Sequence, residues 1–190
     1  MTKAELRKYY RKERSRLTEE ELYMLNTGIL RQLSQLDWQG TRYIHTFLPI
    51  SGQKEPDMWT VIADIRANYP AIKVVVSRSE PKDHSMAHFL LADDTVLKEN
   101  AWGITEPVGG ESVMEMSLDV VFVPLLIVDK EGNRVGYGKG FYDRFLAKCR
   151  PDCKKIGVSF FEPIAEIDDV DPLDVPLDMV VTPYSTIVFA

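Results

Sequence analysis

Apolar residues recur at helical spacing in the first part of the chain. Residues 3–16 contain neither glycine nor proline and are rich in charge, so we expect a highly charged helix there. Thr18 opens a Thr-Glu-Glu-Glu segment, in which a hydroxyl and a carboxylate three residues later can cap a helix start reciprocally. The first 37 residues are therefore predicted to form two helices. The residues that keep the spacing of one face in the second helix are Leu22, Leu25, Ile29, Leu30, Leu33 and Leu36.

After Gly40 the pattern changes to short β-branched runs separated by helical segments. Residues 43–77 have the strand–helix–strand order of a βαβ unit, and residues 94–100 resemble a short connection. Residues 120–128 are apolar without alternation, which is typical of a strand that is buried on both faces of a parallel sheet. The predicted strands are 43–48, 72–77, 86–91, 120–128, 155–159 and 179–182, and the further predicted helices are 57–68 and 141–149.

This order of elements predicts a three-layer α/β domain with a mostly parallel sheet and a helical N-terminal extension. The chain has 190 residues, which is enough for one sizeable core but too few for two ordinary enzymatic domains. It contains no repeat, no low-complexity segment and no linker that would mark a domain boundary. We therefore expect one domain over residues 1–190, with residues 1–37 packed on it.

The charge balance limits the classes of partner. Lys and Arg total 23 and Asp and Glu total 29, so the net charge is -6. Such a molecule repels phosphate backbones and anionic lipid, and neither nucleic acid nor a membrane surface is expected as a partner. A small anionic ligand remains compatible with this charge, because local geometry and a few cations suffice to bind it.

The sequence also indicates a compartment. No run approaches the roughly 20 apolar residues that span a bilayer, and the N-terminal residues lack the apolar core of a signal peptide. We therefore expect a cytoplasmic monomer that acts on small molecules. The only cysteines, Cys149 and Cys153, are then expected to be reduced and structural. His84 and His88 lie four residues apart on a predicted strand, which is too far apart for them to share a metal ion.

Candidate chemistry lies in a glycine-rich segment between a predicted strand and a predicted helix. Ligands of parallel sheets bind at the carboxyl ends of the strands, where the following helix presents unpaired N–H groups to an anion. Gly136, Gly138 and Gly140 allow the backbone to approach a ligand closely, and Arg134 and Lys139 can neutralise phosphate. The segment therefore predicts a polyphosphate site, although three glycines can also simply form a tight connection.

The segment follows neither standard nucleotide pattern. Asn133 stands where the Walker pattern has its first glycine, and Gly140 stands where that pattern has a hydroxyl. The Gly-x-Gly-x-Gly spacing also differs from the dinucleotide fingerprint. Asp143 adds a carboxylate that can hold a magnesium ion bridging phosphates, or that only stabilises the start of the helix.

A longer match connects this segment with a known family. The run from Gly132 to Leu146, together with Val123-Pro124-Leu125-Leu126 and Asp129, resembles the signature of the 5-formyltetrahydrofolate cyclo-ligases, also called 5,10-methenyltetrahydrofolate synthetases. The glycine-rich signature is specific, whereas each flanking match is weak by itself. The flanking matches follow in order along almost the whole chain, as Lys3-Ala4-Glu5-Leu6-Arg7, Phe47-Leu48-Pro49-Ile50 with Glu55, Trp102-Gly103-Ile104 with Glu106-Pro107, and Val175-Pro176-Leu177-Asp178.

The resemblance implies a Rossmann-like sheet and a ring closure that depends on ATP and Mg²⁺. In this reaction 5-formyltetrahydrofolate becomes 5,10-methenyltetrahydrofolate, and ADP and phosphate are released. Transfer of the γ-phosphoryl group to the formyl oxygen would turn a poor leaving group into a good one, and N10 would then attack the activated carbon. The task left to the protein is to align the reactants and to stabilise spreading negative charge.

The resemblance also implies roles for individual residues. Lys139 and Arg134 would be catalytic, Asp143 and Asp178 would bind magnesium, and Glu55 would accept hydrogen bonds from the pterin amidine edge. The implied ATP contacts are Lys3, Arg7, Arg134, Gly136, Tyr137, Gly138, Lys139, Gly140, Phe141 and Tyr142. The implied folate contacts are Ile50, Glu55, Trp102, Tyr137, Gly138, Lys139, Gly140 and Phe141.

Three of these positions need comment. Phe141 stands where tyrosine is common in the family, and Tyr137 stands where some members carry arginine, so a phenol at 141 and a cation at 137 are not required here. Asp178 has Asp169, Asp171 and Asp174 nearby in the sequence, and one of them could take its place as the metal ligand.

Two other functions are compatible with parts of the pattern. A non-catalytic nucleotide- or folate-binding protein on the same scaffold would bind ligand without forming product. A relative of sugar-phosphate isomerases or CoA-transferases would share the sheet architecture, but the pairing of Arg134 and Lys139 in one glycine loop favours a nucleotide.

Overall fold

The computed structural model describes residues 1–80 and 82–189. Helices α1 (Lys3–Arg16) and α2 (Glu19–Leu33) both begin with a capping box. The hydroxyl of Thr18 accepts the N–H of Glu21, and the Glu21 carboxylate accepts the N–H of Thr18. These reciprocal hydrogen bonds satisfy donors that a helix start leaves free, and Thr2 with Glu5 repeats them in α1. The two predicted N-terminal helices are confirmed.

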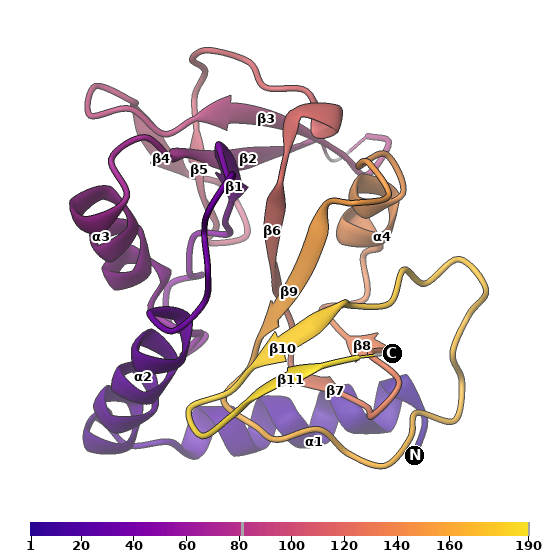
Figure 1. Cartoon of the computed structure of the whole chain (residues 1–190). Coiled ribbons are helices and arrows are strands. Elements are labelled where there is room, and N and C mark those ends of the chain that lie inside the picture. The colour runs from indigo at the N-terminus through magenta and orange to yellow at the C-terminus, as the bar shows by residue number, and fades with distance from the viewer. Residues whose placement is uncertain (81, 190) are drawn as a thin grey trace.

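A seven-stranded sheet forms the centre of the molecule (Figure 1). Its strands are β1 (Tyr43–His45), β2 (Lys73–Glu80), β3 (Ser85–Leu90), β6 (Val120–Pro124), β9 (Lys154–Val158), β10 (Met179–Val181) and β11 (Thr186–Val188). Their order across the sheet is β11-β10-β9-β6-β1-β2-β3. The five inner strands are parallel, and only the edge strands β3 and β11 are antiparallel to their neighbours.

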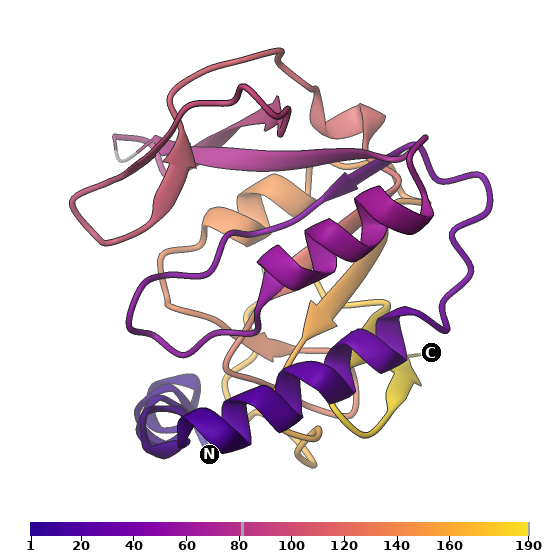
Figure 2. The same ribbon diagram turned by 90° about the vertical axis from the view of Figure 1, so that its left-hand side faces the viewer.

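Helices cover both faces of this sheet. Helices α2 and α3 (Met58–Asn68) lie across one face (Figure 2), and α4 (Phe141–Leu146) lies on the other. Alternate residues of β6 enter the two cores, with Phe122 on the side of α2 and α3 and Val121 on the side of α4. Both side chains are fully buried. The predicted three-layer architecture and the centrally buried strand are therefore confirmed.

The prediction of one strand over residues 120–128 is wrong in its second half. Strand β6 ends at Pro124, which has no N–H to donate to a ladder, and the chain then bends. The remaining residues form β7 (Ile127–Val128), which pairs with β8 (Arg134–Val135) in a separate hairpin. The glycine-rich segment therefore starts from a hairpin beyond the end of the sheet.

Three further elements differ from the prediction. Residues 94–100, expected as a connection, contain β4 (Leu97–Glu99), which pairs with β5 (Thr105–Pro107), and β11 was not predicted at all. Strands β4 and β5 are short and mainly polar, and β11 has only three residues, so their patterns carry little signal. Helix α4 ends at Leu146. The N–H of Ala147 still donates to the carbonyl of Asp143, but those of Lys148 and Cys149 donate to carbonyls three residues back rather than four. A short 3₁₀ turn, η1 (Glu115–Ser117), precedes β6.

Helix α1 lies beyond the carboxyl ends of the parallel strands, beside the β7–β8 hairpin (Figure 1). Leu6 is buried there against Ile127, Val135 and Ile167. The first helix of the chain is thereby fixed at the edge of the sheet where ligands of parallel sheets bind. In the part of the chain that the structure describes, no helix is long and apolar enough to cross a membrane.

Candidate active site

A cavity of about 830 Å³ opens at the carboxyl ends of the parallel strands. Its walls come from α1, the loop after β1, the end of β2, the β4–β5 hairpin, the glycine-rich segment and the loop around residue 173. All the residues that the family resemblance implies line this cavity, with the single exception of Asp178. The fold therefore gathers side chains that lie far apart in the sequence.

The glycine-rich loop forms one wall in a conformation that needs glycine. Gly138 has φ of 85° and Gly140 has φ of 70°, in the left-handed region that side chains rarely adopt. A Cβ atom at Gly138 would also lie 3.2 Å from the Arg7 guanidinium carbon. Arg7 in turn donates from Nε to the carbonyl of Gly136 at 2.8 Å. Helix α1 and the loop are therefore held together by the backbone as well as by side chains.

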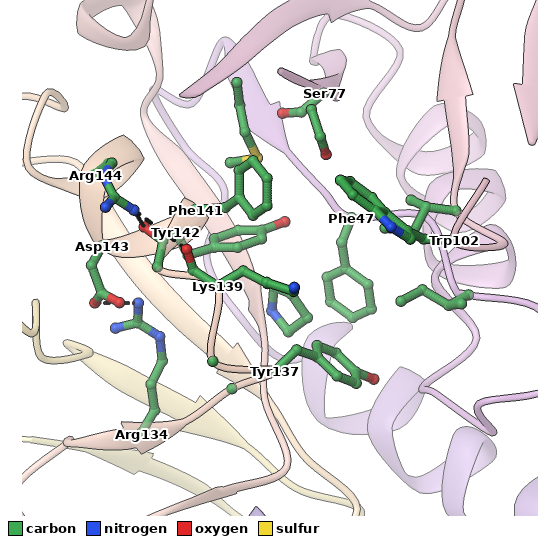
Figure 3. A pocket seen from close by; sticks show the side chains of 18 of the residues that line it. Phe47, Ser77, Trp102, Arg134, Tyr137, Lys139, Phe141, Tyr142, Asp143 and Arg144 are labelled. Atoms are coloured by element: carbon green, nitrogen blue, oxygen red, sulfur yellow. Dashed lines mark hydrogen bonds and ion pairs between the residues drawn. The ribbon is translucent and has the colours of Figure 1, made fainter. Parts of the chain in front are cut away.

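Arg134 and Asp143 form an ion pair at this end of the cavity. Arg134 Nη2 lies 2.6 Å from Asp143 Oδ1, and the Arg134 side chain is only 6% exposed (Figure 3). The same carboxylate oxygen accepts the N–H of Val175 at 3.1 Å, and Arg134 donates to the carbonyl of Val175. The predicted phosphate cation and the predicted magnesium ligand thus neutralise each other in this structure.

Lys139 differs from the other cations of the loop. Its side chain extends from the loop toward the side of the cavity that Phe47 and Trp102 line (Figure 3). Among residues 1–80 and 82–189, no carboxylate lies within ion-pair distance of its ammonium group. Lys3, by contrast, is paired with Asp174, and both side chains are mostly buried. Lys139 is therefore the loop cation that can interact with a ligand without first leaving a partner.

The opposite end of the cavity is largely apolar and contains the buried carboxylate of Glu55. A second buried carboxylate of the lining, Glu106, accepts the N–H of Ser79 at 2.8 Å. Phe47, Trp102 and Phe141 contribute aromatic surface there, and Trp102 is half exposed. Glu55 is only 8% exposed, and its Oε2 accepts the N–H of Ile50 at 2.7 Å. Its Oε1 accepts the hydroxyl of Tyr137. Burial raises the pKa of Glu55, although both hydrogen bonds and the charge of Arg14 oppose this effect.

Two arginines of α1 lie against Tyr137. The guanidinium carbons of Arg11 and Arg14 are 5.3 and 5.6 Å from the centre of the Tyr137 ring, within the range of cation–π contacts. Arg14 also donates to the Tyr137 hydroxyl, and Arg14 is 3% exposed. Burial, together with the charge of Glu55, raises the pKa of Tyr137, so the phenol stays protonated.

A second buried polar chain borders the cavity from the sheet. His45 Nε2 lies 2.6 Å from Ser77 Oγ, which lies 2.8 Å from His88 Nδ1. Burial lowers the pKa of His45 well below its ordinary value and lowers that of His88 to about 4. Both rings are therefore neutral near pH 7. His88 lies on a strand, and among the described residues no group of three His, Cys, Asp or Glu side chains is arranged to hold a metal ion.

Asp178 is the predicted site residue that the structure does not bring to the cavity. Its Oδ2 accepts the N–H of Lys155 at 2.7 Å and lies 2.8 Å from Lys155 Nζ, at the start of β9. The two aspartates that do line the cavity near Lys3 are Asp171 and Asp174. The flanking position chosen from the sequence thus belongs to a structural ion pair, and Asp143 is the only predicted magnesium ligand at the cavity.

Sequence reasoning missed Arg11, Arg14 and the His45–Ser77–His88 chain, and it considered Asp171 and Asp174 only as alternatives to Asp178. A weak signal existed for the arginines, because Lys3, Arg7, Arg11 and Arg14 repeat at the spacing of one helix face. The histidine chain carries no sequence signal, because its members come from three strands and meet only through the sheet register.

Comparisons with known proteins agree with this architecture. A model of the 5-formyltetrahydrofolate cyclo-ligase family matches residues 1–183. A Mus musculus protein named 5-formyltetrahydrofolate cyclo-ligase is 27% identical over 180 residues, which cover 89% of this chain and 88% of that protein. A Haemophilus influenzae protein of the same name is 46% identical over 65 residues, covering 31% of this chain and 35% of that protein.

Two solved structures are similar to the chain. The 5,10-methenyltetrahydrofolate synthetase of Aquifex aeolicus superposes with a TM-score of 0.82 at 28% identity, covering 99% of this chain and 93% of that one. The synthetase of Mycoplasma pneumoniae superposes with a TM-score of 0.73 at 22% identity, covering 96% and 99%. The second likeness shows the fold.

Proposed function

Because the chain belongs to the 5-formyltetrahydrofolate cyclo-ligase family, we propose that it converts 5-formyltetrahydrofolate to 5,10-methenyltetrahydrofolate with ATP and Mg²⁺. One observation carries this proposal. A single cavity has cations along one end, aromatic surface and a buried carboxylate at the other, and the unpaired ammonium group of Lys139 between them. This arrangement suits a polyanion and a flat heterocycle whose reacting atoms meet at Lys139.

The chemistry explains why such a cavity is needed. The formyl oxygen of the folate attacks the γ-phosphorus of ATP, the new O–P bond forms, and the bond to ADP breaks. The N10 nitrogen then attacks the formyl carbon and loses its proton, and the C–O bond breaks as phosphate leaves. Both steps need aligned reactants and neutralised oxygens more than they need covalent help from the protein.

In this proposal each end of the cavity has its own task. Lys139 stabilises charge on the transferred phosphoryl oxygens, while Lys3, Arg7 and Arg134 hold the nucleotide phosphates. Glu55 accepts the N–H groups of the pterin edge, and Trp102, Phe47 and Phe141 pack against its ring. The remaining proposed contacts are the backbone of Gly136, Gly138 and Gly140 and the side chains of Ile50, Tyr137 and Tyr142.

The donors present are compatible with a magnesium ion on the nucleotide. Mg²⁺ in nucleotide sites takes most of its ligands from phosphates and water and only one or two from carboxylates. Asp143 is placed to supply one of these after exchanging its pairing with Arg134. The ion would neutralise charge on the phosphates.

The proposal also includes the domain organisation, the cellular location and the oligomeric state of the molecule. We propose that residues 1–190 form one domain, because α1 is buried against β7 and β8 rather than separate from the sheet. Consumption of ATP supports a cytoplasmic location. We further propose that the protein acts as a monomer, which size-exclusion chromatography with light scattering would test.

The decisive experiment follows product absorbance after mixing the protein with 5-formyltetrahydrofolate, ATP and MgCl₂. Parallel samples lack ATP or contain EDTA. Product that forms only in the complete mixture supports the proposal. Ligand binding without product would identify the non-catalytic alternative, and product in the absence of ATP would overturn the mechanism.

A further inference from the structure

Arg14 is a charged residue in an environment that does not by itself require a charge. It lies on the inner face of α1 and is 3% exposed, and within residues 1–80 and 82–189 no carboxylate lies within ion-pair distance of its guanidinium group. The only hydrogen-bond acceptor of this side chain, in the same described part of the protein, is the hydroxyl of Tyr137. A buried cation without an ionic partner is costly, and an apolar side chain would fill the position at lower cost. The fold alone therefore gives no reason for Arg14.

The directions of the hydrogen bonds link Arg14 to Glu55. A guanidinium group has no acceptor, so the Tyr137 oxygen must accept from Arg14. The only proton of that hydroxyl is then donated to Glu55 Oε1. Since the phenol has one proton, the direction of the whole chain is fixed from Arg14 through Tyr137 to Glu55.

The acceptors that remain on Glu55 match a pterin edge. A carboxylate offers about four lone-pair positions on its two oxygens. Ile50 takes one position on Oε2 and Tyr137 takes one on Oε1, so each oxygen keeps one for a ligand. A pair of adjacent N–H donors, as on the pterin ring, needs two such positions side by side. The hydrogen bonds to Ile50 and Tyr137 thus decide which way the free positions point.

We propose that Arg14 is a positioning residue for folate binding, which acts through the Tyr137 hydroxyl to hold the Glu55 carboxylate oriented and ionised. This inference rests on the proposed function, because it takes Glu55 as the acceptor of the pterin edge. It adds a residue outside the cavity lining, and it connects helix α1 to folate recognition rather than to the nucleotide alone.

The groups around Glu55 determine the pH dependence that this role predicts. Tyr137 and Tyr142 face it from the glycine-rich segment, and Arg14 faces it from α1, with Arg11 on the ring of Tyr137. Burial raises the pKa of Glu55 and Arg14 lowers it. Loss of Arg14 should therefore leave more of the carboxyl protonated at mildly acidic pH, where it no longer accepts two hydrogen bonds.

The experiment compares Arg14→Met and Tyr137→Phe with the double variant. Each single change should raise the KM for 5-formyltetrahydrofolate about tenfold, with kcat and the KM for ATP altered less than about threefold. Both residues act through one hydrogen-bond chain. The KM of the double variant should therefore equal that of the worse single variant, and the two single effects should not multiply. In Arg14→Met the acidic limb of kcat/KM should move to higher pH, and Arg14→Lys should restore part of the loss.

Matched controls separate positioning from packing. Arg16→Met alters an exposed arginine of the same helix, and Tyr10→Phe removes the hydroxyl of a tyrosine that packs on Phe161. Both should keep the wild-type KM. Tyr137→Phe deletes one oxygen and keeps the ring, so it tests the proposal even if Arg14→Met does not fold. Unchanged KM values in a folded Tyr137→Phe protein would overturn the inference, as would equal losses for folate and ATP.

A binding measurement distinguishes failure of this inference from failure of the proposed function. Trp102 is half exposed in the cavity, so its fluorescence reports 5-formyltetrahydrofolate without turnover. If wild type forms no product, the proposed function fails, and the dissociation constants of the variants still test the role of Arg14. If wild type turns over and the variants bind folate as tightly as it does, only the inference about Arg14 is wrong.

Discussion

The two ends of the cavity hold their charges in different ways. One end is the proposed nucleotide site and is called the nucleotide end. There Arg134 pairs with Asp143 and Lys3 with Asp174, so cations and anions face each other directly. The other end is the proposed folate site and is called the folate end. There the neutral hydroxyl of Tyr137 separates Glu55 from Arg14, and all three residues are mostly buried. One end is a set of ion pairs, and the other is a single directed hydrogen-bond chain.

This difference indicates what each end can do when a ligand arrives. A polyanion or a metal ion can replace one partner of an ion pair, so the nucleotide end can exchange its partners. The single proton of the Tyr137 hydroxyl is already donated to Glu55, so this buried chain cannot be rearranged without leaving a polar group unsatisfied. The nucleotide end therefore suits a ligand that changes charge during the reaction, and the folate end suits a ring that must be held in one orientation.

The strongest test of the nucleotide end is Lys139→Ala. This cation faces the reacting atoms in the proposal, and removal of such a group costs about 10²–10³ in turnover. We expect kcat to fall by that amount, with an unchanged circular dichroism spectrum. Lys130→Ala, at an exposed position in the β7–β8 hairpin, should keep full activity. A Lys139→Ala enzyme with more than a tenth of the wild-type kcat would contradict the assigned role.

The corresponding test of the folate end is Glu55→Gln. The amide keeps the shape but loses the charge and one acceptor, so we expect the KM for 5-formyltetrahydrofolate to rise about 30-fold, as for a lost hydrogen bond to a charged group. Steady-state kinetics at saturating ATP would measure it. The KM for ATP should stay within about twofold, and a parallel rise in both constants would show that the two ends are not independent.

A smaller effect locates the magnesium ion. Asp143→Asn should raise the MgCl₂ concentration for half-maximal activity about tenfold, because the cavity loses a carboxylate that can bind the ion. Asp178→Asn should leave that concentration unchanged and lower only the melting temperature, since Asp178 pairs with Lys155 outside the cavity. The reverse result would place the metal at Asp178, which the family resemblance implies as a ligand together with Asp143.

The smallest expected effect is the loss of folding stability on acidification that follows from burying the imidazole of His88 beside the folate end. The pKa of His88 falls from 6.5 to about 4 on folding, so its contribution to stability is fully present above pH 6.5 and is lost as the pH falls toward 4. Between about pH 7 and pH 5.5 we expect a loss of about 1 kcal/mol, or a few degrees in Tm. His88→Gln should weaken this dependence and leave the part that comes from His45, whose pKa burial also lowers, whereas His84→Asn should retain all of it. A wild-type Tm that rises on acidification would contradict this assignment.

The sequence predicted most of the fold because its strongest signals are local. The capping box at Thr18, the helical spacing after it and the unbroken apolar run at residues 120–124 each depend on neighbours along the chain. Signals fail where a strand has only three residues, as in the β4–β5 hairpin and in β11. Beyond Pro124, the bend could not be read from hydrophobicity, because the residues on both sides of it are buried.

The site was predictable to the extent that it lies in one segment. Residues 134–143 carry most of the candidate chemistry, and a family resemblance extends it to Glu55 and Trp102. The residues that were not predicted form hydrogen bonds with residues of other elements, such as Arg14 with Tyr137 and His45 with Ser77. The ion pair of Asp178 was equally impossible to predict, because its partner Lys155 lies on β9 and no local pattern connects the two residues.

The position of α1 has a consequence for how the protein is made. Arg7 and Gly136 are separated by 129 residues, Arg14 and Tyr137 by 123, and Lys3 and Asp174 by 171. At synthesis rates of about 5–20 residues per second, α1 leaves the ribosome roughly 6 to 34 seconds before its partners exist. During that interval Leu6 and the four basic residues of its inner face have nothing to pack on. The cavity is therefore incomplete until residue 174 has been made, and a nascent chain halted before residue 136 would contain the sheet's first strands but no site.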